Sequence, residues 1–103
     1  MSIRQVGQIG QIVFSKKGRD KGKAMVIISV EGEYVFLADG QLRPLNKPKK
    51  KKAKHIQPTQ HIMENVRLAF GQANVDVVDE LQTATGGLTD ADIRKRLRSF
   101  LGS

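Results

Sequence analysis

The chain has no cysteine and no tryptophan, and it contains only two histidines. Without cysteine, disulfide bonds and thiolate metal sites are excluded. The two histidines, His55 and His61, are too few to build a zinc or iron site from imidazole ligands. The sequence therefore predicts neither a metal nor any other cofactor.

Long apolar runs are also missing. The longest, Ala24 to Ile28 and Tyr34 to Ala38, have five residues each, whereas a membrane-spanning helix needs about 20. No secretory segment can be recognised either. With 103 residues, of which 39% are hydrophobic and 27% charged, the chain is expected to form one soluble domain at most and to stay in the cytoplasm, away from membranes.

Acidic residues are scarce in the first half of the chain. Residues 1–58 contain 13 Lys and Arg against 4 Asp and Glu, whereas residues 59–103 contain 5 against 6. The net charge of +8 therefore comes entirely from the first half. A segment this basic is typical of a protein that binds a polyanion.

What the chain does contain is a basic loop between two apolar stretches, Gln11 to Ser15 and Lys23 to Val30. Gly18 and Gly22 supply the backbone freedom that a tight connection between strands requires. Five cations within eight residues make this loop a candidate site for an anion. These cations are Lys16, Lys17, Arg19, Lys21 and Lys23.

The same stretch resembles the KOW motif. The resemblance rests on Gly10, Val13, Gly18, Lys21-Gly22-Lys23 and the apolar Val26 and Val30. More narrowly, residues 8–58 are similar to short bacterial KOW-domain RNA-binding proteins that resemble a large-subunit ribosomal protein of archaea and eukaryotes. The stretch VFSKKGRDKGKAMVI and the lysine run followed by HIQPT carry this closer similarity. The resemblance implies an SH3-like barrel, a role in translation as part of a ribonucleoprotein, and ribosomal or other structured RNA as the ligand.

The turn signals predict five short strands, which favours a small barrel. The strands are expected at residues 11–15, 23–30, 34–38, 41–45 and 54–57. Glu31-Gly32-Glu33 and Asp39-Gly40 are the turns around the third of them. The predicted fold class is thus mainly β. A five-stranded SH3-like barrel over residues 1–58 is followed by a helical or partly disordered segment over residues 59–103.

Alternation along the second and third strands leaves both faces of the sheet apolar. Val26, Ile28 and Val30 would share one face of the second strand, and Met25 and Ile27 the other. A sheet that is apolar on both sides must be covered on both. Barrel closure, the C-terminal segment, another subunit and stacked nucleobases are the candidates, and packing within the chain is favoured.

Residues 46–54 form a second basic stretch, with six lysines in nine residues. Mutual repulsion favours a solvated, extended run over a helix. The run can be a solubilising linker or a contact for the RNA backbone, and its proximity to the basic loop favours the second interpretation. Its lysines are Lys47, Lys49, Lys50, Lys51, Lys52 and Lys54.

Stacking on unpaired bases would require aromatic or guanidinium groups, which are few in this chain. The candidates are Phe14, Tyr34, Phe36, Arg19 and Arg43. Arg19 is the favoured one, because its planar head can stack on a base or bind a phosphate from the tip of the loop. Arg43 is also assigned to the RNA-binding set.

The second half predicts helices. The first is expected from Thr59, as its cap, to Phe70, with Gly71 as its stop. A second piece is expected around residues 75–81, before a flexible break at residues 83–87. The last helix has the strongest signals, because Thr89 and Asp92 match a capping box.

An apolar stripe on this last helix consists of Ile93, Leu97, Phe100 and Leu101. Residues 59–103 hold too little apolar bulk for a core of their own. They must either dock on the barrel or order on a partner. Several glycines interrupt the segment, and we therefore expect it to be loosely attached or mobile.

Catalysis is not expected. The glycines of the basic loop are separated by three residues where a phosphate-binding loop has four, and Ala24 stands where such a loop needs Ser or Thr. Asp39 and the two histidines belong to no acid/base or nucleophile motif. The sequence thus predicts an RNA-binding protein. The alternative is an adaptor that binds a ribosomal or transcription-complex protein, and contact with anionic lipid ranks third.

Overall fold

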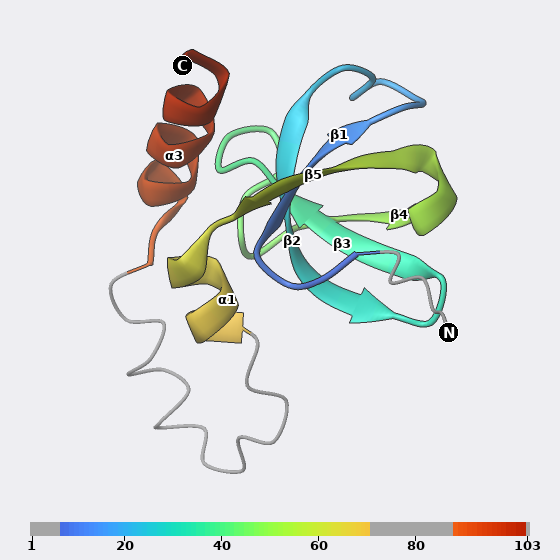
Figure 1. Ribbon diagram of the computed structural model, residues 1–103, viewed down its shortest axis with the longest axis horizontal. Coiled ribbons are helices and arrows are strands. Elements are labelled where there is room, and N and C mark those ends of the chain that lie inside the picture. Colours follow the sequence, from blue (N-terminus) through green and yellow to red (C-terminus); the bar gives the residue numbers. More distant parts are fainter. Residues whose placement is uncertain (1–6, 71–87, 103) are drawn as a thin grey trace, which may run out of the picture.

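The computed structural model describes residues 7–70 and 88–102, as a sheet with helices packed on it (Figure 1). The elements are β1 (Gln11–Ser15), β2 (Ala24–Glu31), β3 (Tyr34–Ala38), β4 (Lys49–Lys52), a short 3₁₀ helix η1 (Ala53–His55), β5 (Ile56–Ile62), α1 (Glu64–Phe70) and α3 (Asp90–Gly102). Neither described helix is long and apolar enough to cross a membrane. The expected stop at Gly71, helical piece at residues 75–81 and break at residues 83–87 lie outside the described residues.

The five strands form one antiparallel sheet in the order β4-β3-β2-β1-β5. This confirms a mainly β fold with five strands. No ladder joins β4 to β5 in the described part of the chain, so the sheet is open between its two edge strands. Closure into an SH3-like barrel is therefore not confirmed.

The first three strands lie where the sequence predicts them, but the prediction of a fourth strand at residues 41–45 is wrong. The side chain of Asp39 accepts hydrogen bonds of 2.8 Å from the backbone amides of Gln41 and Arg43. These bonds fold the segment into a turn. The fourth strand is instead the lysine run, which pairs with β3 from Tyr34↔Lys52 to Leu37↔Lys49.

The fifth strand is longer than expected. It begins at Ile56 rather than at Lys54, because Lys54 and His55 belong to η1, and it continues to Ile62. The prediction of a helix starting at Thr59 is therefore wrong, and α1 begins only at Glu64. Thr59 does not cap a helix. Its hydroxyl donates a hydrogen bond of 2.7 Å to the carbonyl oxygen of Ile12 in β1.

A bulge in β2 changes which residues share a face. Ile27 pairs with Leu37 and Ser29 with Phe36, which leaves Ile28 as an extra residue. A single extra residue reverses the alternation that follows it. Val30 therefore pairs with Val35 and shares its face, and the prediction that Val30 lies with Val26 and Ile28 is wrong.

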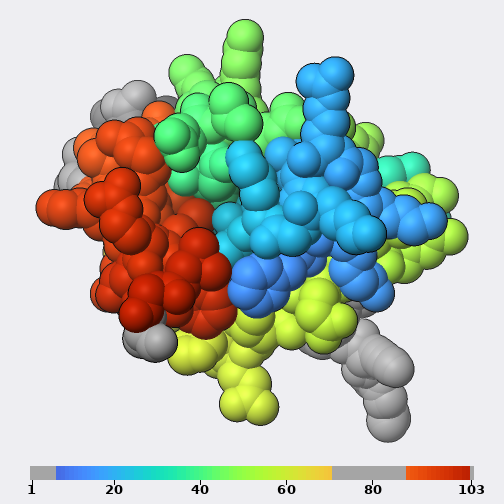
Figure 2. Space-filling view, turned by 90° about the horizontal axis from the view of Figure 1, so that it is seen from above, coloured from blue at the N-terminus to red at the C-terminus, as the bar shows by residue number. Residues whose placement is uncertain are grey.

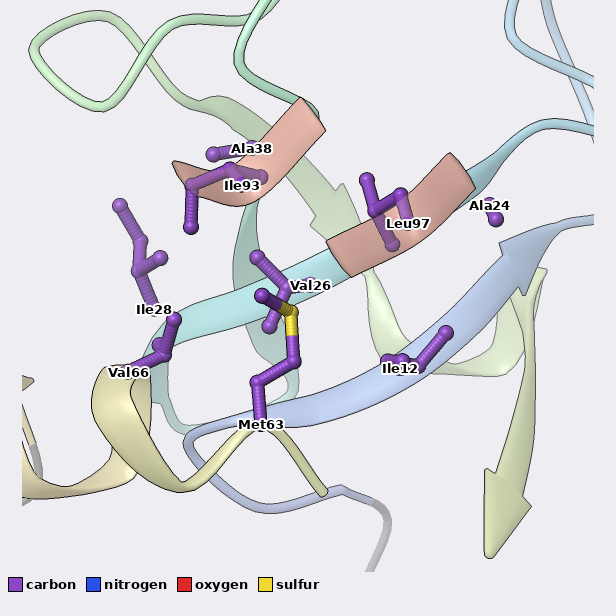
Figure 3. Close-up of a cluster of buried hydrophobic side chains, with 9 residues drawn as sticks. All are labelled: Ile12, Ala24, Val26, Ile28, Ala38, Met63, Val66, Ile93 and Leu97. Carbon is purple, nitrogen blue, oxygen red and sulfur yellow. The ribbon is translucent and has the colours of Figure 1, made fainter. Parts of the chain in front are cut away.

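The two faces of the sheet bury two separate clusters. On one face the buried residues are Val13, Met25, Ile27, Val35, Leu37, Ala53 and Ile56. On the other they are Ile12, Ala24, Val26, Ile28, Ala38, Met63, Val66, Ile93 and Leu97, drawn in Figure 3. Packing within the chain thus covers both faces, as the sequence predicts.

The second cluster includes two residues of the α3 stripe, since Ile93 is fully buried and Leu97 is 5% exposed. Phe100 packs against this cluster, whereas Leu101 is exposed. The expectation of a loosely attached segment is therefore wrong for α3. The capping box is confirmed, since Thr89 Oγ1 accepts from the Asp92 amide at 3.2 Å and Asp92 Oδ2 accepts from the Thr89 amide at 3.0 Å. α3 docks on the face of β2 that carries Val26 and Ile28, a surface that the sequence alone does not identify.

Candidate nucleic-acid interface

The basic loop between β1 and β2 is closed by its own backbone. The Gly22 amide donates to Ser15 O at 2.8 Å, and the Lys21 amide donates to Gly18 O at 3.1 Å. Gly18 has a φ of 84° and Gly22 a φ of 85°, so both occupy the left-handed region that favours glycine. The loop is thus a tight, defined turn rather than a slack connection.

Four cations of this loop are exposed. They are Lys16, Lys17, Arg19 and Lys21. Their side chains form no hydrogen bond or ion pair with any residue that the structure describes. These four charges are therefore available to an external anion.

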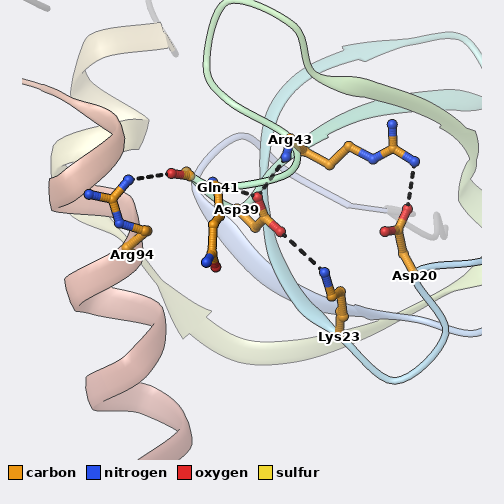
Figure 4. Close-up of polar contacts among 7 residues, drawn as sticks. Asp20, Lys23, Asp39, Gln41, Arg43 and Arg94 are labelled. Carbon is orange, nitrogen blue, oxygen red and sulfur yellow. Dashed lines mark hydrogen bonds and ion pairs between the residues drawn. The ribbon is translucent and has the colours of Figure 1, made fainter.

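Asp20, the one acid of the loop, points inward. It is 4% exposed and accepts a hydrogen bond of 3.1 Å from Nη2 of Arg43 (Figure 4). The loop therefore presents cations outward while its negative charge is neutralised from within. Arg43, which the sequence assigns to the RNA-binding set, instead supports the loop through this bond to Asp20.

Lys23 also takes part in this internal network. Its Nζ lies 3.8 Å from Oδ2 of Asp39, the residue that folds the turn after β3 (Figure 4). Lys23 is half-buried, whereas the four exposed cations of the loop have no such partner. Lys23 therefore supports the turn after β3 rather than being wholly available to an external anion.

The structure brings the lysine run to the basic loop. Nζ of Lys51 in β4 donates a hydrogen bond of 2.7 Å to the carbonyl oxygen of Lys17, 34 positions earlier in the chain. The same Nζ lies close to Gly18. We use the name basic surface for the loop cations and the neighbouring end of the lysine run, namely Lys16, Lys17, Arg19, Lys21, Lys51, Lys52 and Lys54.

His55 lies at the junction of the two basic segments. Its carbonyl oxygen accepts a hydrogen bond of 2.8 Å from the Lys16 amide. Partial burial, followed by the positive fields of Lys17, Lys54, Lys51 and Lys52, lowers the pKa of the His55 side chain. The lowered pKa favours the neutral form of this imidazole, which lies within a cluster of positive charge.

The remaining lysines of the run are placed differently. Lys50 Nζ lies 4.6 Å from the ring centroid of Tyr34 and 5.9 Å from that of Phe36, which is a cation–π arrangement. Lys49 begins β4 opposite Leu37, and Lys47 lies on the connection before it. Neither of these two is joined to the basic loop by a hydrogen bond or ion pair in the described ranges.

Most of the side chains predicted to stack on bases already contact other parts of the protein. Phe14 and Phe36 pack against the second core cluster, and Phe14 lies 6.0 Å from Phe100, between ring centroids. Tyr34 is covered by Lys50. Arg19, exposed at the tip of the loop, is the candidate that keeps its planar group accessible.

Sequence reasoning missed two contributors to this region. His55 could have been found, because it directly follows the lysine run. Arg98 of α3 lies beside the basic loop, where it lines a groove with Lys23. Only the docking of α3 reveals this neighbour, and no spacing in the sequence indicates it.

Neither a protein-family model nor a curated protein matches this chain. Within residues 7–70 and 88–102, no three His, Asp or Glu residues gather closely enough to hold a metal ion.

Proposed function

We propose that this protein binds structured RNA through the basic surface, as a KOW-type protein whose curved sheet corresponds to an SH3-like barrel. The observation that carries the proposal is the bond between Lys51 and the Lys17 carbonyl oxygen, which joins two basic segments into one surface. None of its seven cations has an acidic partner among the described residues. Phosphate oxygens of a nucleic acid are the natural counter-charges for such a surface.

The position of the acids supports a polyanion rather than a small anion. Asp20 is turned inward to Arg43. Glu31 and Glu33 lie in the hairpin between β2 and β3, beside the Lys52 end of β4, and form no ion pair with the cations of the described residues. Seven cations spread over the loop, β4 and η1 can contact several phosphates at once. The resemblance to KOW proteins supports ribosomal or other structured RNA as the ligand, in the context of translation.

The salt dependence of binding tests this proposal. Each phosphate contact contributes about 0.7–0.9 to the slope of log K against log salt concentration. Replacing Lys16, Lys17, Arg19 and Lys21 by Gln should weaken the binding of a structured RNA and flatten this slope. Two single variants remove the same charge at different places on the protein. Lys17→Gln, in the basic surface, should flatten the slope, whereas Lys95→Gln, on the exposed side of α3, should not.

Retention on an acidic protein, at the same ionic strength as the RNA measurement, distinguishes RNA binding from an adaptor role. We expect stronger retention on RNA. Equal or stronger retention on the acidic protein, or an unchanged salt slope in the four-residue variant, would favour the adaptor and count against RNA binding. Crosslinking in cells, with sequencing of the attached RNA, would then name the ligand.

A further inference from the structure

A groove of about 550 Å³ lies between the basic loop, the turn after β3 and α3. Figure 2 shows the corresponding face of the molecule, with α3 in red beside the light-blue loop and the green segment that follows β3. Gly22 and Ala24 line the groove on the loop side, and Leu97 and Leu101 line it on the helix side. Its volume falls within the range of about 300–1,000 Å³ typical of pockets for small organic groups.

The walls of the groove offer apolar surface to a ligand. Leu101 is 59% exposed, although it belongs to the apolar stripe of α3. At Gly22 an added Cβ would meet no atom within 4 Å, so the loop leaves space on its side of the groove. A flat group with apolar faces fits such walls.

The charge that remains unpaired around the groove is positive. Asp39, the one acid among the lining residues, accepts two backbone hydrogen bonds and faces Lys23. Arg94 already donates to the carbonyl oxygen of Gly40. Arg98 is exposed and has no hydrogen bond or ion pair with the residues that the structure describes.

A cleft with both apolar and polar lining residues and an unpaired guanidinium at its edge matches the chemistry of a single nucleotide, which combines a flat base with a phosphate. Gly22 and Lys23 belong both to this groove and to the basic loop, so an RNA strand held on the loop passes the mouth of the groove. Bases within a duplex are stacked and cannot enter a groove, whereas those in bulges and loops can be splayed out.

We infer that the groove between the basic loop and α3 receives one unpaired nucleotide of the bound RNA, with its base against Leu101 and its phosphate on Arg98. This inference rests on the proposed function. It specifies the class of RNA, namely helices interrupted by a bulge or a single-stranded loop.

Two hairpin RNAs test the inference, one with a single-nucleotide bulge and one fully paired but otherwise identical. The wild-type protein should bind the bulged RNA about tenfold more tightly, or about 1.4 kcal/mol, because the splayed-out base removes the exposed side chain of Leu101 from water. Arg98→Gln and Leu101→Ser should reduce this preference to near one while keeping the affinity for the paired hairpin. Both residues are exposed, so neither change disturbs the core. Lys95→Gln is the control and should keep the preference.

A fluorescent base analogue, 2-aminopurine, at the bulge provides a second measurement. Its emission should change on binding to the wild type and much less on binding to Leu101→Ser. Equal affinity of the wild type for the two hairpins, or a preference that survives in both groove variants, would overturn the inference while leaving RNA binding intact. Failure of the wild type to bind either hairpin would overturn the proposed function, and this inference with it. An unchanged 2-aminopurine signal would show that the bulged base does not enter the groove, and would also overturn the inference.

Discussion

Arg94 donates a hydrogen bond of 2.6 Å to the carbonyl oxygen of Gly40, and this bond ties α3 to the turn that follows β3. A second bond, of 2.7 Å from the Leu45 amide to Asp90 Oδ1, fastens the far side of the same segment to the start of the helix. Asp39 and Arg43 of this segment in turn hold Lys23 and Asp20 of the basic loop. The C-terminal helix therefore supports the basic loop through an intervening turn.

Docking of α3 predicts a large difference between two leucines of the same helix. Leu97 is 5% exposed and Leu101 is 59% exposed. Leu97→Ala should lower the free energy of unfolding by about 2–5 kcal/mol, because it leaves a cavity in the second core cluster. Leu101→Ala should change it by less than about 0.5 kcal/mol. Urea unfolding of the two variants measures both values, and similar small losses would mean that α3 is not docked in solution.

Two glycines with positive φ should respond differently to substitution by alanine. Gly22→Ala places a Cβ in open space, so it should cost about 1 kcal/mol from backbone strain alone. At Gly40 a Cβ would overlap the carbonyl oxygen of Asp90. Gly40→Ala should therefore cost about 1–3 kcal/mol more than Gly22→Ala, because α3 has to move. Thermal unfolding compares the two, and an equal loss would contradict the close approach of α3 to this turn.

The ion pair between Arg43 and Asp20 predicts a non-additive effect. Arg43→Met leaves the carboxylate of Asp20, which is 4% exposed, without its partner. We expect a loss of about 1–3 kcal/mol in the free energy of unfolding. The double variant with Asp20→Asn should regain part of this loss, since the buried charge is then removed as well. Additive losses in the double-mutant cycle would show that the two side chains act independently.

The lowered pKa of His55 predicts that the stability of the protein depends on pH. Its pKa in the folded protein lies below the ordinary value of about 6.5, through partial burial and the fields of four nearby lysines. The unfolded chain therefore takes up the proton more readily, and stability present above about pH 6.5 should be lost as the pH falls through the folded pKa. Lowering the pH from about 7 to about 5 should destabilise the wild type more than His55→Gln.

An NMR titration of the His55 ring protons checks the direction of this shift. The midpoint should lie below that of a short peptide containing the same residue. RNA phosphates would reduce the field of the lysines, so saturating RNA should raise the pKa of His55. A midpoint at the peptide value in the free protein would contradict the crowding of cations around this side chain.

The structure of the lysine run is only partly predictable from the sequence. Repulsion correctly favours an extended backbone, but it does not indicate pairing with β3, because that depends on partners distant in the chain. Lys50 lies over Tyr34 and Lys51 donates to the Lys17 carbonyl oxygen. These contacts compensate part of the repulsion, and none of them is visible as a local pattern.

The basic loop and the capping box were predictable because each is local. The positive φ of Gly18 and Gly22 follows from the demands of a tight connection, and the bonds between Thr89 and Asp92 follow from their spacing. The groove was not predictable, because it exists only where α3 meets the loop. Val30 lies on the face opposite to the predicted one because of the bulge in β2, and the alternation of apolar residues alone does not reveal that bulge.

The second core cluster also imposes an order on folding during synthesis. It joins Ile12 of β1 to Ile93 and Leu97 of α3, which are far apart in the chain. The first three strands emerge from the ribosome before α3 is made. Met63 and Val66 can pack on the face that carries Val26 and Ile28, but its cover stays incomplete until Ile93 and Leu97 are available. Contacts of such long sequence separation also form slowly. The nascent chain therefore passes through a stage in which an apolar sheet face is accessible to chaperones and to other nascent chains.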